Sequence, residues 1–163
     1  MENSVSVGLG EIAVSRNPNE VLVAYGLGSC LGIGMYDPVA KVAGLLHAVL
    51  PESPANNNLN GSAAKYVNTG ISELLKSMEK AGASPERSKI RVVGGANMLL
   101  SSSLSKTFDI GTRNIDAARK TFEKLRLRVA AEEVGGHTGR TVRLFVQDGR
   151  MTFRVVGEKE QDI

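Results

Sequence analysis

Short apolar runs separated by turn residues make up most of the chain. They cover residues 5–14, 21–24, 31–36, 42–50, 89–93, 128–134, 141–146 and 151–156. Runs of this length, rich in Val, Ile and Leu and bounded by Gly, Asn, Asp or Pro, are typical of β-strands. The glycines inside residues 5–14 predict a bend or bulge in that strand. The pattern therefore predicts a protein built mainly from short strands.

Two segments instead show apolar positions at three- and four-residue spacings, which indicates amphipathic helices. Residues 62–81 are the clearer of the two, with Ser62 as the expected N-cap and Gly82 as the expected stop. The second helix is expected to begin with Asn114 as its cap and to reach about Leu125.

Strands cluster at both ends of the chain, helix separates them, and no repeat or linker divides the sequence. We therefore expect an α/β fold, a single-domain sandwich of mixed, largely antiparallel sheet with covering helices, spanning residues 1–163. The charged tail, residues 158–163, is expected to fray. The polar segment 52–61 is interpreted as a surface loop, or alternatively as a flap beside a site.

Composition excludes several classes of function. The chain has 163 residues, a net charge of +3 and 4% aromatic residues, so neither a strongly basic surface nor stacking side chains favour nucleic acid as a partner. Its one cysteine rules out an internal disulfide. The start of the chain lacks the pattern of a secretory leader, and no apolar run is long enough to span a bilayer. These features predict a cytoplasmic protein without membrane insertion.

The cysteine lies in a glycine-rich turn. Cys30 ends residues 26–30, Gly-Leu-Gly-Ser-Cys, and His47 lies late in the second of the two apolar runs that follow. A turn at residues 37–38 would fold these runs into a hairpin that brings thiol and imidazole together. The imidazole can take the thiol proton, and main-chain N–H groups of the turn, such as that of Ser29, can hold an oxyanion. Such a set indicates acyl transfer on amides, esters or thioesters.

Other familiar sites are absent from the sequence. Gly26 and Gly28 do not form a dinucleotide fingerprint, because Leu31 occupies the third glycine position and no βαβ unit follows. There is no phosphate-binding Gly-Lys-Ser/Thr loop. One cysteine and two histidines are too few for a zinc site unless carboxylates contribute. We therefore expect neither a cofactor nor a metal.

The Cys/His pair also has a purely structural interpretation. A lone cysteine in an apolar run is usually a small buried hydrophobe, and a histidine between Leu46 and Ala48 is usually a core or surface residue. His137, in a second glycine-rich loop, is interpreted as exposed. Spacing alone leaves both interpretations of Cys30 and His47 open.

An ordered set of segments along nearly the whole chain favours the catalytic interpretation of Cys30 and His47. The set comprises Gly26-Leu27-Gly28-Ser29-Cys30, Tyr36-Asp37, residues 44–47, Leu50-Pro51, Lys65-Tyr66, Gly94-Gly95-Ala96, Ile110-Gly111, Arg113-Asn114, Gly135-Gly136 and Gly139-Arg140. It resembles the CheD family, the chemoreceptor glutamine deamidases of bacterial and archaeal chemotaxis. The resemblance implies a fold similar to the catalytic domain of cytotoxic necrotizing factor toxins.

The resemblance also implies a reaction and its partners. The reaction is hydrolysis of glutamine side-chain amides on the cytoplasmic helices of chemoreceptors (methyl-accepting chemotaxis proteins), with ammonia released. Carried onto this sequence, Cys30 is the nucleophile and His47 the base. A CheC-type phosphatase is implied as a further protein partner, which would compete with receptors for the same surface.

One position departs from the family pattern. The family usually has a threonine six residues before the cysteine as a third catalytic member, and this chain has Ala24 there. We interpret a main-chain carbonyl near Ala24 as orienting the imidazole instead. The alternative is a catalytically weak or inactive interaction module that binds receptors or a CheC-type phosphatase. A more distant alternative is another cysteine amidohydrolase or a transamidase.

Overall fold

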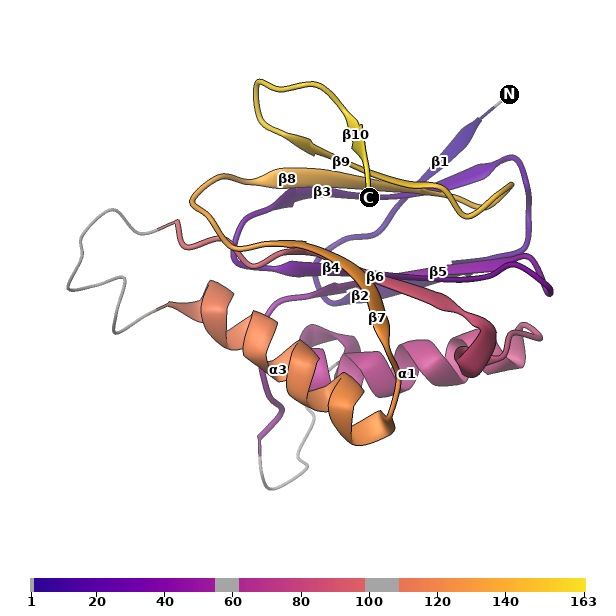
Figure 1. Ribbon diagram of the computed structural model, residues 1–163, viewed down its shortest axis with the longest axis horizontal. Coiled ribbons are helices and arrows are strands. Elements are labelled where there is room, and N and C mark those ends of the chain that lie inside the picture. Colours follow the sequence, from indigo (N-terminus) through magenta and orange to yellow (C-terminus); the bar gives the residue numbers. More distant parts are fainter. Residues whose placement is uncertain (1, 55–61, 99–108) are drawn as a thin grey trace.

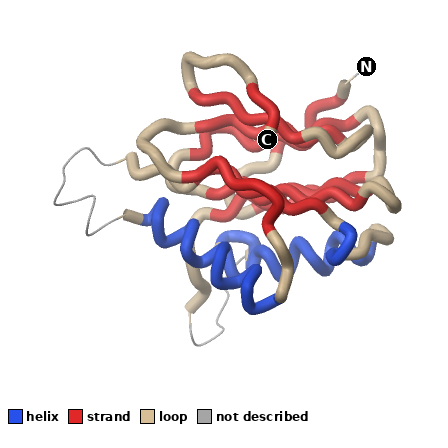
Figure 2. Tube along the Cα trace, viewed as in Figure 1, coloured by secondary structure: helices blue, strands red, loops and turns tan. Residues whose placement is uncertain are grey.

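In the part of the chain that the structure describes, two sheets and two α-helices are stacked in three layers. The computed structural model describes residues 2–54, 62–98 and 109–163. Two five-stranded sheets lie face to face, and helices α1 (Val67–Lys80) and α3 (Ile110–Leu125) cover the outer face of one of them (Figure 1). We call the helix-covered sheet the second sheet and its neighbour the first sheet. Figure 2 shows the same three layers in the order first sheet, second sheet and helices.

Both sheets are mixed. The first sheet has the order β1 (Asn3–Ser6), β3 (Glu20–Leu27), β8 (Arg140–Phe145), β9 (Met151–Val155) and β10 (Gln161–Asp162). The second has the order β2 (Glu11–Ser15), β5 (Val42–Ala48), β4 (Leu31–Asp37), β6 (Lys89–Gly94) and β7 (Val129–Val134). The pairs β1–β3 and β6–β7 are parallel, and the other pairs are antiparallel. The predicted α/β class is confirmed, with the strands divided between two sheets.

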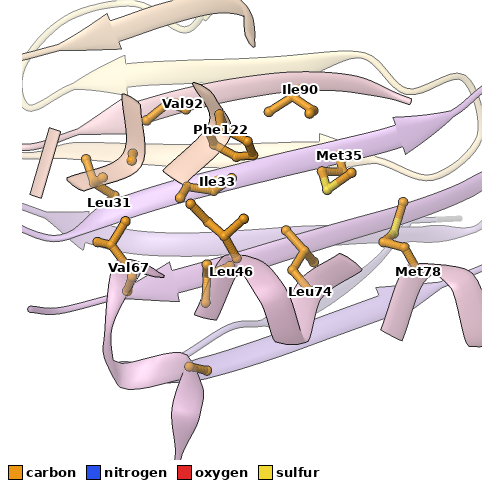
Figure 3. Close-up of a cluster of buried hydrophobic side chains, with 14 of the residues drawn as sticks. Leu31, Ile33, Met35, Leu46, Val67, Leu74, Met78, Ile90, Val92 and Phe122 are labelled. Atoms are coloured by element: carbon orange, nitrogen blue, oxygen red, sulfur yellow. The ribbon is translucent and has the colours of Figure 1, made fainter. Parts of the chain in front are cut away.

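The second sheet is the middle layer, and its central strands β4 and β5 are buried along their whole length. Side chains alternate between the faces of a strand, so Leu31, Ile33 and Met35 face the helices while Tyr36 faces the first sheet. Figure 3 shows the helix-side cluster, in which β4 meets Val67, Leu74, Met78 and Phe122 of the two helices. Burial on both faces explains why these runs are almost entirely apolar.

The single bent strand expected at residues 5–14 is wrong. β1 and β2 are separate strands that belong to different sheets. Gly10 lies between them with a φ of +71°, which glycine adopts without strain. The chain therefore crosses from the first sheet to the second at this turn. It crosses again between β3 and β4, through the turn that contains Cys30.

Both helices begin differently from the prediction. Ser62 caps a short 3₁₀ helix, Ala63–Lys65, and α1 begins only after Tyr66. The second helix is capped by Asp109, whose carboxylate accepts a hydrogen bond from the Thr112 N–H. Asn114 is therefore not a cap but a buried residue inside α3. Neither helix is both long and apolar enough to cross a membrane.

The end of the chain pairs with the first sheet, whereas the sequence predicted a frayed tail for residues 158–163. β10 pairs antiparallel with β9, and the Ile163 N–H donates to the Met151 carbonyl at 3.0 Å. The charges that suggested fraying form ion pairs: Asp162 contacts Arg150, just before β9, at 2.9 Å, and Glu160 contacts Arg143 of β8 at 3.2 Å.

Candidate active site

The hairpin predicted from residues 31–50 is present and brings the cysteine and histidine segments together. β4 and β5 pair with Gly32 opposite His47 and Leu31 opposite Ala48. Cys30 immediately precedes β4, so it lies one residue beyond the last pair of the ladder. Alternation puts Cys30, Gly32 and His47 on the same face, toward the first sheet. The thiol and the imidazole are thus diagonal neighbours on one face of the hairpin, and Gly32 between them has no side chain.

His47 is held in one orientation by a main-chain carbonyl. Its ring is 3% exposed, and Nδ1 lies 2.9 Å from the carbonyl oxygen of Val7. A carbonyl oxygen can only accept, so Nδ1 carries a proton, and in the neutral ring Nε2 then carries the lone pair. Nε2 is buried and has no hydrogen-bond partner among the described residues. The imidazole is therefore set up to accept a proton at Nε2.

Val7 occupies this position because of the parallel pairing of β1 with β3. Ser6 pairs with Val23, and the Val7 N–H donates to the Val23 carbonyl at 2.8 Å. The register therefore puts Val7 beside Ala24. Ala24 itself is fully buried among apolar side chains and carries no polar side-chain atom. The carbonyl oxygen beside the imidazole thus belongs to Val7, a residue that the sequence did not single out.

The Cys30 turn is held by its carbonyl groups. The Gly28 carbonyl accepts from the Ala96 N–H at 2.8 Å, and the Cys30 carbonyl accepts from the Gly95 N–H at 2.9 Å. Gly94 has to be glycine, because its φ is +116° and an added Cβ would lie 2.2 Å from the Cys30 oxygen. The carbonyl between them, that of Ser29, accepts from the Asn114 side chain at 2.8 Å.

Cys30 is a half-buried free thiol that packs against the apolar residues between the sheets. Burial raises its pKa, and a hydrogen bond from its own main-chain N–H acts in the opposite direction with a smaller effect. The thiol is therefore protonated at neutral pH and needs a base to become a nucleophile.

The other candidates from the sequence, His137 and the segment 52–61, are not part of this pair of segments. His137 is exposed, and its Nδ1 lies 2.9 Å from the Asn97 carbonyl oxygen. Most of the segment 52–61, the possible flap, lies outside the described residues. In the described ranges, no three His, Cys, Asp or Glu side chains are grouped so that they could hold a metal ion.

Comparison with known proteins identifies the family. A model of the family described as "CheD chemotactic sensory transduction" matches residues 49–155. The chain belongs to the CheD family. This confirms the resemblance seen in the sequence. The segment matched by the CheD model begins just after His47, but pairwise alignments with CheD relatives extend over nearly the whole chain and include both candidate residues.

Three of these CheD relatives show the extent of the likeness. The probable chemoreceptor glutamine deamidase CheD of Symbiobacterium thermophilum is 39% identical over 158 residues, which is 97% of this chain and 96% of that protein. The Pyrococcus horikoshii protein of the same name is 44% identical over 94% of this chain and 93% of its own length. The chemoreceptor glutamine deamidase CheD of Thermotoga maritima is 38% identical over 95% of this chain and 94% of its own length.

Among solved structures, the Bacillus licheniformis hypothetical protein YfiH matches 77% of this CheD chain and 51% of its own, with a TM-score of 0.49 and 13% identity.

Proposed function

We propose that the chain is a cysteine-dependent protein-glutamine deamidase that acts on chemoreceptors, with Cys30 as nucleophile and His47 as general base. Relatives aligned over almost the full chain bear the name chemoreceptor glutamine deamidase, which supports the reaction. The observation that carries the residue assignment is the register Gly32–His47, which puts the thiol and an imidazole with a free Nε2 on one face.

In the first half of the reaction, Nε2 of His47 takes the thiol proton and the sulfur attacks the carboxamide carbon of a receptor glutamine. Main-chain N–H groups of the turn hold the oxyanion that forms. The C–N bond then breaks while the imidazolium returns the proton to nitrogen. Ammonia leaves, and a thioester to Cys30 remains.

In the second half, His47 takes a proton from water and the oxygen attacks the thioester carbon. The sulfur leaves and regains its proton from the imidazolium. One carboxamide and one water thus become one carboxylic acid and one ammonia, and no oxidant or cofactor is consumed. The new negative charge on the receptor biases its signalling state.

Val7 takes the role that a threonine hydroxyl has in the usual family pattern. Its carbonyl lies 2.9 Å from Nδ1 of His47 and fixes the tautomer that leaves Nε2 free. Ala24 contributes through its main chain, because the peptide unit that joins it to Val23 accepts the Val7 N–H at 2.8 Å. The missing hydroxyl at Ala24 is therefore compensated, and the enzyme is active.

The resemblance also implies where the chain acts, which partners it has and which fold it shares, and we include these expectations in the proposal. The chain acts in the cytoplasm, as a single domain spanning residues 1–163, on the cytoplasmic helices of chemoreceptors. A CheC-type phosphatase is a further partner, and neither nucleic acid nor a membrane is. The fold is similar to the catalytic domain of cytotoxic necrotizing factor toxins.

The test is ammonia release from a receptor cytoplasmic fragment, compared between wild type, Cys30→Ala and His47→Ala. We expect release with wild type, none with Cys30→Ala, and a loss of about 10²-fold or more with His47→Ala, the usual contribution of a general base. Ammonia release that persists in Cys30→Ala would overturn the residue assignment.

The same assay separates the alternatives. A transamidase would attach an added primary amine to the receptor fragment, whereas a deamidase gives only glutamate and ammonia. An interaction module would bind the fragment without releasing ammonia from it. Binding of the fragment by wild type without ammonia release would therefore favour the inactive module. It would indicate that Ala24, in place of the usual threonine, impairs catalysis.

A further inference from the structure

Asn114 joins the two strand ends that carry the candidate catalytic residues. It is fully buried in α3, and its Nδ2 donates to the Ser29 carbonyl at 2.8 Å and to the Val49 carbonyl at 3.0 Å. Ser29 directly precedes Cys30, and Val49 follows His47 by two residues. One side-chain amide from the helix layer therefore uses both of its N–H donors to tie the cysteine turn to the end of the histidine strand.

This polar residue is not explained by packing. The neighbouring residues on the inner face of α3 are apolar and form part of the helix-side core. The Oδ1 of Asn114 is buried and has no partner among the described residues, which is a cost that an apolar side chain would avoid. An asparagine at this position thus needs a reason beyond filling the space between α3 and the second sheet.

The hydrogen bond that Asn114 donates to the Ser29 carbonyl determines which way the Cys30 N–H points. A peptide unit is planar and trans, so its N–H points opposite to its C=O. The Ser29 carbonyl and the Cys30 N–H belong to one such unit. Because Asn114 holds that carbonyl toward α3, the Cys30 N–H points away from the helix. It therefore points toward the side of the second sheet on which the thiol lies, where an oxyanion would form after attack by the sulfur.

The position of Asn114 relative to the turn is itself fixed. α3 begins in close contact with the segment that holds the turn, since a Cβ on Gly111 would lie 2.4 Å from the Ala96 oxygen and 2.5 Å from the Gly95 oxygen. Ala96 and Gly95 in turn bind the carbonyls of Gly28 and Cys30. Three consecutive carbonyls of the turn are therefore held by the start of α3 and the strand end beside it.

We propose that Asn114 is a positioning residue for the deamidation. By holding the Ser29 carbonyl, it keeps the Cys30 N–H aimed at the developing oxyanion, and by holding Val49 it keeps this turn in register with the strand of His47. The inference rests on the proposed function. Oxyanion donors act only in the transition state, so the contribution of Asn114 belongs in kcat and not in KM.

The test compares Asn114→Ala with a matched control, Phe122→Leu, by ammonia release from a receptor fragment and by urea unfolding. Phe122 lies in the same helix, is 2% exposed and belongs to the apolar helix-side core. We expect Asn114→Ala to lower kcat about 10- to 100-fold with KM changed less than about twofold, because it misdirects an oxyanion donor whose outright removal costs more. Phe122→Leu should lose stability but keep its kcat.

A second readout separates positioning of the N–H from damage to the thiol. Alkylation of Cys30 by iodoacetamide needs the thiolate but forms no oxyanion, so its rate in Asn114→Ala should fall much less than kcat does. Should Asn114→Ala be poorly folded, Asn114→Ser, which keeps one hydroxyl donor, should show an intermediate loss of kcat.

Three outcomes would overturn the inference. They are a kcat of Asn114→Ala equal to that of Phe122→Leu, a loss confined to KM, and an equal loss of alkylation rate and kcat. Wild type without Cys30-dependent ammonia release is a different result, since it would overturn the proposed function and this inference with it.

Discussion

At the Cys30 thiol, burial and the imidazole act in opposite directions. Burial raises the thiol pKa, whereas the imidazole on the same face has an Nε2 without a hydrogen-bond partner among the described residues, which offers a proton acceptor. This combination fits a thiol that loses its proton only as it attacks, rather than a preformed thiolate. The fixed tautomer of His47, set by the Val7 carbonyl, is what makes such a transfer available.

The reactivity of Cys30 toward iodoacetamide should therefore depend on His47. In His47→Ala the thiol must ionise alone, so the pH midpoint of alkylation should lie above the ordinary thiol pKa of about 8.5. Wild type should react faster than His47→Ala at neutral pH. The measurement is the alkylation rate by intact mass across pH, with the urea-unfolded protein as the reference for a free thiol. A midpoint at or below that reference in His47→Ala would contradict the account.

Ala24 gives a second prediction at this scale. If the Val7 carbonyl already orients His47, restoring a hydroxyl with Ala24→Thr should change kcat for deamidation less than about threefold. Ala24→Val has the same shape without the hydroxyl and is the matched control. Both should lose about 1–3 kcal/mol of unfolding free energy, because Ala24 is fully buried and has little room to grow. A tenfold gain in kcat for threonine over valine would mean that the imidazole lacks an orienting partner.

At the scale of elements, the hairpin that aligns Cys30 with His47 is closed by a buried carboxylate. Asp37 ends β4 and is fully buried. It accepts hydrogen bonds from Arg87 Nη2 at 2.7 Å and from the N–H groups of Ser84 at 2.8 Å and Val39 at 2.9 Å. The Arg87 guanidinium, above all, holds the pKa of Asp37 well below its usual range. The turn is thereby joined to the segment that follows α1.

Replacing this carboxylate should destabilise the protein in a pH-dependent way. Asp37→Ala leaves buried N–H groups without an acceptor and should cost about 3 kcal/mol of unfolding free energy at pH 7. The folded-state pKa is lowered, so the contribution is complete above the unfolded value of about 3.9 and is lost as pH falls below it.

Urea unfolding of wild type and Asp37→Ala, at pH 7 and below pH 4, measures both effects. Asp148→Ala is the control, because Asp148 accepts one main-chain N–H in an exposed turn and should cost less than about 1 kcal/mol. A stability difference for Asp37→Ala that is small at pH 7, or that grows as pH falls, would contradict this role.

The elements that local patterns determine were predictable, and the contacts between distant segments were not. The runs on either side of Asp37 predicted β4, β5 and their turn, which was enough to bring the segments of Cys30 and His47 together. Nothing local shows that Gly10 sends β1 and β2 to different sheets. Nor can a sequence mark Val7, because every residue has a carbonyl. Asn114 did leave a signal: it continues the apolar stripe of α3, where a polar residue has to find a buried partner.

At the scale of the whole molecule, each layer supplies one part of the candidate site. The second sheet carries Cys30 and His47, the first sheet brings the Val7 carbonyl, and the helix layer contributes Asn114. The layers meet at the end of the sandwich where the chain crosses between the sheets. Packing of the three layers therefore sets the geometry of the site, which explains why a largely apolar fold places polar groups here.

The most direct test of the account is the intact mass of a chemoreceptor cytoplasmic fragment after incubation with wild type and with Cys30→Ala. We predict a gain of about one dalton for each glutamine converted, and only with wild type, because the amide NH2 is replaced by a carboxyl OH. An unchanged mass on a fragment that binds the protein, or an equal gain with Cys30→Ala, would contradict the account.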